Sequence, residues 1–283
     1  GEKIFRPWVK QIEKAGAKVL SQHRVTDVII DNHNKVKGVV CGDEVFEADA
    51  VIFAVGVTGM KKIVASSPSL QSKPEFRNLS NLGAIDVLAT RLWFDRKVNI
   101  PLPSNACFGF DETTGWTFFD LNALHDEYKH EPGTVIEADF YHANQFLNLS
   151  DAEIIKIVQS YLTTCVPDFQ KAKVIDSNVI RLSQAVTHFA PGSYRYMLPA
   201  KTSFTNIFMS GDWIINRHGS WSQEKAYVTG LEAANLVISY LQKGEKANIL
   251  PVEADENHIQ IARGVNQTLR SLGNFILPKY WLP

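Results

Sequence analysis

The run from Ala50 to Val55 is apolar at every position and ends at Gly56. A strand with one solvated face alternates apolar and polar residues, so this unbroken run predicts a buried central strand that is covered on both faces. A second short apolar strand, residues 207–210, leads into Gly211-Asp212 and then into a long helical pattern. The apolar positions of that helix are Ala226, Leu231, Ala234, Val237, Ile238 and Leu241. Covered strands that alternate with helices predict an α/β fold.

The first 50 residues contain a helix pattern and a hairpin pattern. Apolar residues at helical spacing, followed by Gly16, predict a helix over residues 5–15. Residues 25–30 and 36–40 flank a turn rich in Asn and Asp, so we expect them to pair as a hairpin, with a third strand around Val45.

Strand patterns fill the middle of the chain. The candidates are residues 84–94, 117–121, 135–141, 179–187 and 194–198. One helix interrupts them, since Ser150 and Glu153 form a capping box and Pro167 ends the pattern. The segment is rich in large apolar side chains, which suit either an apolar tunnel or, for most of them, a sheet core. They are Leu92, Trp93, Phe94, Phe108, Phe110, Trp116, Phe118, Phe119, Phe140 and Tyr141.

A chain of 283 residues is long enough for two domains. Between Ser66 and Asn78 the composition turns to Ser, Pro, Gln and Lys, and we place a domain crossing there. We expect residues 1–65 and 205–245 to form one discontinuous domain. Residues 66–204 would form a mixed β-sheet domain that binds substrate, and residues 246–283 a C-terminal tail or helix.

Composition and charge exclude several classes of protein. Hydrophobic residues make up 45% and charged residues 21%, which is typical of a globular protein and not of a disordered chain or a coiled coil. The 29 Lys and Arg nearly balance the 30 Asp and Glu, so the protein has no positive net charge that would attract a polyanion. We therefore expect no nucleic-acid partner.

The cysteines and the apolar runs indicate a compartment. Cys41, Cys107 and Cys165 form neither a disulfide framework nor a Cys-x-x-Cys pair, so a reducing compartment is expected. No apolar run approaches the roughly 20 residues that span a bilayer, and no signal-peptide core is present. We expect a cytoplasmic or plastid protein, either soluble or peripheral to a membrane, and not a secreted one. The histidines lack metal-ligand spacing, so no metal site is expected.

The strand, Gly-Asp, loop and helix order has its own chemistry. A helix that starts near Ser222 presents free backbone N–H groups and a positive dipole end, and Gly219 and Ser220 let a ligand approach the main chain. Asp212 can accept hydrogen bonds from sugar hydroxyls. An ordinary strand-loop-helix with an Asp in its turn explains the same pattern.

Gly211-Asp212, Gly219-Ser220 and the stretch from Gln223 to Ala234 together resemble the C-terminal flavin-binding motif of the FAD-dependent amine oxidase superfamily, and most closely its carotenoid (phytoene or zeta-carotene) desaturase branch. The resemblance implies an FAD-binding Rossmann-like domain, with Asp212 meeting the ribityl and pyrophosphate part of FAD. The other FAD contacts that it implies are Val25 at the adenine, Gly56 beside the dinucleotide, Ser220, Trp221 and Ser222 at the flavin, and the matching position Glu224.

Two departures from the family pattern stand out. No Gly-x-Gly-x-x-Gly phosphate loop occurs, and Lys225 replaces a small residue of the helix motif. We expect the chain to be the C-terminal part of a longer or split flavoprotein, whose partner is its own N-terminal remainder or a companion chain. A degenerate homologue without flavin is the alternative.

The resemblance implies an FAD-dependent oxidoreductase, a desaturase or an amine-oxidase-like enzyme. It would act on an apolar, carotenoid or isoprenoid, substrate by hydride transfer to the flavin. Because the flavin carries that chemistry, we assign no catalytic acid or base. The rival reading is a non-catalytic structural or assembly subunit of a larger complex.

The amphipathic pattern over residues 258–276, with Arg263 and Arg270, predicts contact with a membrane surface or a protein partner, or packing on the domain.

Overall fold

The computed structural model describes residues 3–110, 115–218 and 223–276. The chain divides into two compact units. The first comprises Gly1–Val55, Gly59–Leu79 and Leu198–Pro283, and the second comprises Gly56–Thr58 and Ser80–Met197.

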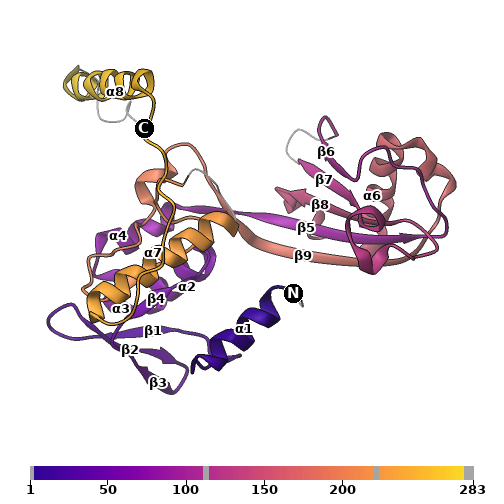
Figure 1. The fold of residues 1–283 in the computed structure, drawn as a ribbon. Coiled ribbons are helices and arrows are strands. Elements are labelled where there is room, and N and C mark those ends of the chain that lie inside the picture. Colours follow the sequence, from indigo (N-terminus) through magenta and orange to yellow (C-terminus); the bar gives the residue numbers. More distant parts are fainter. Residues whose placement is uncertain (1–2, 111–114, 219–222, 277–283) are drawn as a thin grey trace. The chain divides into compact units, whose positions relative to one another are not determined.

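The first unit holds a small parallel sheet, an antiparallel sheet and most of the long helices (Figure 1). Its helices are α1 (Phe5–Lys14), most of α2 (Val57–Ser66), α3 (Pro68–Gln71), α4 (Pro74–Arg77), α7 (Gln223–Leu241) and α8 (Asn257–Ile276). Its strands are β1 (Asp27–Ile30), β2 (Val36–Cys41), β3 (Glu44–Glu47), β4 (Val51–Phe53) and β10 (Ile207–Met209). The predicted helix at the start of the chain is confirmed as α1, and the predicted helix pattern near the end as α8.

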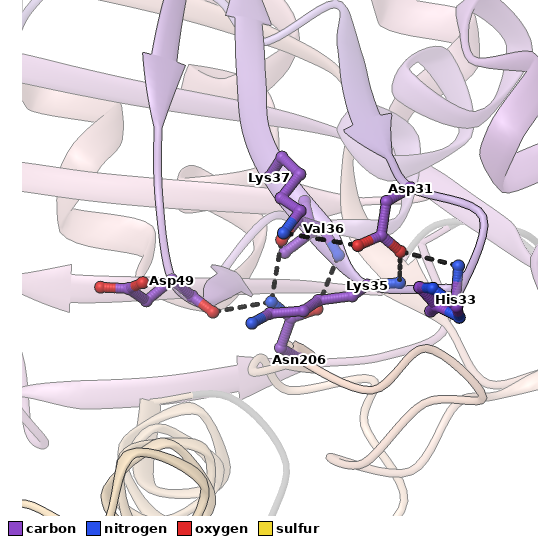
Figure 2. Close-up of polar contacts among 7 residues, drawn as sticks. All are labelled: Asp31, His33, Lys35, Val36, Lys37, Asp49 and Asn206. Atoms are coloured by element: carbon purple, nitrogen blue, oxygen red, sulfur yellow. Dashed lines mark hydrogen bonds and ion pairs between the residues drawn. The ribbon is translucent and has the colours of Figure 1, made fainter.

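The predicted hairpin and third strand are also confirmed. β1 pairs with β2 and β2 with β3, both antiparallel. Asp31 shapes the turn, because its Oδ1 accepts hydrogen bonds from the amides of His33 at 2.8 Å and Lys35 at 3.0 Å (Figure 2). Asn34 takes the left-handed conformation with φ 58°, which Asn tolerates better than most residues. These two local signals fix the hairpin.

Asn206 ties the hairpin to the start of β4 (Figure 2). Its side-chain oxygen accepts from the amide of Val36 at 2.7 Å. Its side-chain nitrogen donates to the carbonyl oxygens of Val36 at 2.9 Å and Asp49 at 2.6 Å. Asn206 is completely buried, so these bonds satisfy the polar atoms of its side chain, which water cannot reach. The antiparallel sheet is thereby held beside β4 and β10.

β4 and β10 run parallel, with Val51 opposite Ile207 and Phe53 opposite Met209. Val51 and Phe53 are buried, but Ile52 between them is 40% exposed. The expectation of a strand covered on both faces is therefore wrong for Ile52. In the described part of the chain, β4 pairs only with β10.

α7 packs on β10 with a different face from the one its apolar pattern predicts. The side chains that it buries are Lys225, Val228, Thr229 and Ala233. The expected apolar positions are only half-buried, and Leu241 is 37% exposed. A two-stranded sheet offers a narrow surface, so the helix buries one short stripe where it crosses β10.

The second unit is a five-stranded antiparallel sheet with the order β6-β7-β8-β5-β9. Its strands are β5 (Gly83–Phe94), β6 (Ser104–Cys107), β7 (Trp116–Asp120), β8 (Val135–Tyr141) and β9 (Val174–His188). Its helices are α5 (Leu121–Leu124) and α6 (Asp151–Cys165), and short 3-10 helices lie at Asp126–Tyr128, Ala143–Phe146, Pro167–Lys171 and Ser193–Tyr196. Another 3-10 helix, Asn78–Asn81, lies at the crossing between the units.

α6 covers one face of this sheet. The predicted capping box is present, since the amide of Ser150 donates to Glu153 Oε2 at 2.9 Å and Ser150 Oγ accepts from the amide of Glu153 at 3.4 Å. The core between helix and sheet contains Leu92, Phe94, Trp116, Phe118 and Phe140, so the core interpretation is confirmed for these five. Phe108, in contrast, is 82% exposed.

One predicted strand is absent from the structure, and two elements of the structure were not predicted. The segment 194–198 is not a strand. Gly192 adopts φ 81° and leads into the 3-10 helix Ser193–Tyr196. The sequence patterns also missed α2 and the short edge strand β6.

Candidate functional site

A cavity of about 500 Å³ lies in the first unit, beside the start of β1. Its lining comes from residues 23–26, from Val55 after β4, and from Gly59, Lys62, Ile63 and Ser66 of α2. Val25, Val55 and Ile63 give it an apolar surface, while Arg24 and Lys62 bring two cationic side chains. Pockets of this size, mostly apolar with a few polar groups, commonly bind small molecules and cofactors.

The two walls of the cavity are bonded to each other. Ser66 Oγ, at the end of α2, donates to the carbonyl oxygen of Thr26. Thr26 in turn donates its amide to the carbonyl of Val40 in β2 at 2.8 Å. On the other side, α2 starts close to the chain that follows β4, since a Cβ at Gly59 would come within 2.6 Å of a methyl of Val55. The cavity is therefore bounded by anchored backbone.

Val25 lies in this cavity just before β1 begins. Among the described residues, no main-chain hydrogen bond involves Val25, although its neighbour Thr26 is bonded to β2. The amide and carbonyl of Val25 are therefore available to a ligand. A flat, polar-edged group such as adenine can use this kind of main-chain donor and acceptor.

The turn after β10 is built around Gly211. Its φ of +147° favours glycine, and a Cβ there would lie 3.3 Å from the indole nitrogen of Trp213. The amide of Gly211 donates to Thr229 Oγ1 of α7 at 2.9 Å. That hydroxyl also lies 2.8 Å from the carbonyl oxygen of Lys225, to which it can donate its proton. The turn is thus fastened to the first part of α7.

The same turn is fastened to the cavity wall. Trp213 is completely buried, and its Nε1 donates to the carbonyl oxygen of Val55 at 2.9 Å. Val55 also lines the cavity that contains Val25. The segments that follow β4 and β10 are therefore neighbours, as the sequence predicted, and Val55 joins the Gly211-Asp212 turn to the cavity.

Asp212 and Lys225 form the charged part of this region. Asp212 is half-buried and Lys225 is 9% exposed. Burial lowers the pKa of Lys225, and the negative charge of Asp212 acts in the opposite direction. The lysine that departs from the family motif therefore lies where it interacts with the acidic residue of that motif.

The remaining predicted site residues are placed as follows. Gly56 directly follows Val55 and is exposed, as is Glu224 in the first turn of α7. Gly219, Ser220, Trp221 and Ser222 lie outside the described residues. Val55 and Thr229 lie within segments that carry the family resemblance, but sequence reasoning assigned neither residue a role, and it did not identify the α2 residues of the cavity. The apolar run that ends at Val55 was the one available signal for them.

The described residues fit the part of a dinucleotide that they would contact. The cavity has the size for a nucleoside, a free main-chain edge at Val25, and cationic side chains at Arg24 and Lys62 that suit phosphate. Within the described ranges, no group of His, Cys, Asp and Glu side chains is arranged to hold a metal ion. None of the helices in those ranges is long and apolar enough to cross a membrane.

Two relatives are similar to this chain in sequence. The chain is 24% identical over 243 residues to the chloroplastic/chromoplastic 15-cis-phytoene desaturase of Solanum lycopersicum. The match covers 84% of this chain and 41% of that protein. It is 26% identical over 208 residues to the carotenoid phi-ring synthase of Chlorobaculum tepidum, covering 70% of this chain and 31% of the relative. The chain thus spans less than half the length of these two relatives.

The fold is also found in a solved structure. Cyclohexylamine oxidase from Brevibacterium oxydans IH-35A superposes with a TM-score of 0.55 at 11% identity, covering 78% of this chain and 49% of that one. The protein-family model for flavin containing amine oxidoreductases matches residues 6–238, which is most of the sequence. The chain therefore belongs to the flavin containing amine oxidoreductase family.

Proposed function

We propose that this chain is the part of an FAD-dependent oxidoreductase that holds the adenine and ribityl regions of the cofactor, and that the whole protein removes hydride from an apolar carotenoid or isoprenoid substrate. One observation carries the cofactor proposal. Val55 lines the cavity next to Val25 and also accepts the hydrogen bond of Trp213, so the two predicted FAD-contacting segments meet at one residue.

In this proposal the main chain of Val25 recognises the adenine edge, and the apolar side chains of Val55 and Ile63 pack against its ring. Arg24 and Lys62 supply positive charge for phosphate. Asp212 accepts hydrogen bonds from ribityl hydroxyls, and the buried Lys225 interacts electrostatically with that carboxylate. Thr229 keeps the turn at a fixed distance from α7.

When bound, FAD supplies the hydride acceptor. The residues described here bind and orient it, and none of them needs to act as an acid or a base. The names of the relatives support an apolar polyene as the substrate class. Their chloroplastic members support a plastid location, and the length of chain that they possess beyond this match supports an N-terminal remainder or a companion chain as partner.

The flavin content of an Asp212 variant tests the cofactor site. We expect Asp212→Ala to lower the flavin-to-protein ratio of the purified full-length protein, because the hydroxyls that the carboxylate binds lose their partner. Asp43→Ala, in the exposed turn between β2 and β3, is the matched control and should keep the ratio unchanged. Equal visible flavin absorbance in both variants would remove Asp212 from the site.

A pair of variants at Val25 tests main-chain recognition. Val25→Ala keeps the amide and should retain flavin, whereas Val25→Pro deletes the N–H and should lose it, with melting temperature recorded for both. Conversion of 15-cis-phytoene by the flavin-loaded protein tests the substrate class. If the protein binds flavin but converts no polyene, the alternative of a structural or assembly subunit is favoured. If the protein never binds flavin, the proposed cofactor site is wrong.

A further inference from the structure

Two of the three cysteines, far apart in sequence, meet in the second unit. Cys107 is the last residue of the edge strand β6, and Cys165 is the last residue of α6. Their sulfur atoms lie 3.8 Å apart, although 58 positions separate them in the chain. Cys107 is buried and Cys165 is exposed. One thiol of the pair is therefore open to a reagent, and the other lies directly behind it.

Ring contacts next to the cysteines hold this arrangement. Tyr161 precedes Cys165 by one helical turn, so both side chains project from the same face of α6. The Tyr161 ring lies 4.8 Å from that of Phe110 and 5.7 Å from that of Trp116, between centroids. Trp116 is the cross-strand partner of Cys107 in β7. The end of β6 and the end of α6 are thus packed together independently of the sulfur contact.

We propose that Cys107 and Cys165 form an intramolecular disulfide when the protein meets an oxidised low-molecular-weight disulfide such as glutathione disulfide. The thiolate of Cys165 attacks one sulfur of glutathione disulfide, and the bond between the two glutathione sulfurs breaks. The thiolate of Cys107 then attacks the Cys165 sulfur and expels the second glutathione. Two protein thiols are oxidised, and one glutathione disulfide is reduced to two glutathione thiols, which take up the two protons.

The environment of the thiols determines how fast this exchange runs. Burial and the neighbouring Cys165 raise the pKa of Cys107 to about 12, and burial also raises the pKa of Cys165. Only a small fraction of either thiol is ionised near neutral pH, so the exchange should be slow there. Because the thiolate is the nucleophile, the rate should rise by about tenfold for each unit of pH in this range.

The product is expected to be more stable than the reduced protein. The bridge joins the free edge of the sheet to the helix that covers it, and it closes a loop of 58 positions. Cross-linking across such a loop removes entropy from the unfolded chain, so oxidation should raise the melting temperature of the second unit on the order of 5 to 10 °C.

Mass spectrometry of the native full chain tests the proposal. After equilibration with glutathione disulfide, we expect the intact mass to fall by about 2 Da and digestion to yield one peptide pair that joins Cys107 to Cys165. Cys41→Ser is the matched control and should show the same loss. Cys107→Ser should instead retain a glutathione adduct on Cys165, and Cys165→Ser should form no bridge.

Three results would overturn the inference. They are an unchanged mass at equilibrium, a lasting glutathione adduct on Cys165 while Cys107 is intact, and a bridge that includes Cys41. Ser is close in size to Cys, so we expect each variant to fold. The melting temperature of each reduced variant checks this expectation. If a variant does not fold, the mass changes of the native protein and of Cys41→Ser still test whether the bridge between Cys107 and Cys165 forms.

Discussion

Asn206 shows how much one polar side chain fixes in the first unit. Its amide joins Val36 and Asp49, which are 170 and 157 positions away, through three hydrogen bonds, of which the two to Val36 are buried and the one to Asp49 is partly buried. Asn206→Ala would leave an amide and two carbonyl oxygens without partners, so we expect a loss of roughly 2 to 4 kcal/mol in the free energy of unfolding. Urea titration measures this free energy of unfolding. Asn248→Ala, on an exposed side chain, should change little, and similar stability in the two variants would contradict this role of Asn206.

Asp139 in β8 makes stability depend on pH. Burial, with the nearby Glu137, raises its pKa from 3.8 to about 6, and Arg91 acts in the opposite direction. Between these two values the unfolded chain releases a proton that the folded chain keeps, so stability falls as the pH rises through this window and the loss is complete above it. Asp139→Asn should remove this dependence.

We expect Asp139→Asn to raise the free energy of unfolding by about 1 to 2 kcal/mol near pH 8 and to change it little near pH 4. This figure is reduced from the full linkage value because the side chain is partly exposed. Denaturant titrations at both pH values provide the comparison, with Asp176→Asn on an exposed part of β9 as control. A gain of the same size at both pH values would show that the charge of Asp139 is not its cause.

At the scale of elements, the hydroxyl of Thr229 connects α7 to the turn after β10. Thr229→Val keeps the shape of the side chain but leaves the partly buried amide of Gly211 without its acceptor. We expect a loss of roughly 1 to 3 kcal/mol in stability and a lower flavin content, because the turn that carries Asp212 is no longer fastened.

The matched control is Thr163→Val in α6, whose hydroxyl donates to the carbonyl of Gln159 one turn earlier. That variant should stay within about 0.5 kcal/mol of the natural protein. If Thr229→Val lost no more stability than Thr163→Val, the bond to Gly211 would not be what fastens the turn.

Elements with local signals were predictable from sequence, and those that depend on distant contacts were not. The capping box at Ser150 and the Asn-rich turn of the hairpin act within a few residues, and both were found. α2 was missed because Val57, Thr58 and Gly59 are weak helix formers, so its first turn depends on its tertiary surroundings. β6 is too short and polar to carry a strand pattern.

In the candidate site, too, local sequence signals were predictable and contacts between distant residues were not. The resemblance to the family pointed to Val25 and Asp212 in the sequence. The bond from Trp213 to Val55 that joins their surroundings spans 158 positions, and no local pattern encodes it. The contact between Cys107 and Cys165 is likewise a product of topology, since it appears only when α6 covers the sheet. Sequence reasoning thus named candidate cofactor residues but not the contacts that bring their surroundings together.

At the scale of the whole molecule, the C-terminal helix α8 presents apolar side chains to solvent. Ile261, Val265 and Leu269 recur every four residues on one face, and they are 68%, 54% and 61% exposed. A helix whose apolar face is exposed adds little buried area, so deleting residues 252–283 should move the melting temperature by less than about 2 °C.

The same deletion tests attachment through α8. An exposed apolar face with a nearby cation such as Arg263 is typical of a helix that lies on an anionic bilayer surface. We therefore expect the full chain to float with vesicles that contain anionic phospholipid, and both the deletion and the double variant Ile261→Gln with Val265→Gln to float less. Gln260→Ala, one position from Ile261, serves as the control and should float like the full chain. If the deletion instead melted much lower while flotation stayed the same, the apolar face of α8 would pack within the protein, and its contribution would be to stability and not to attachment.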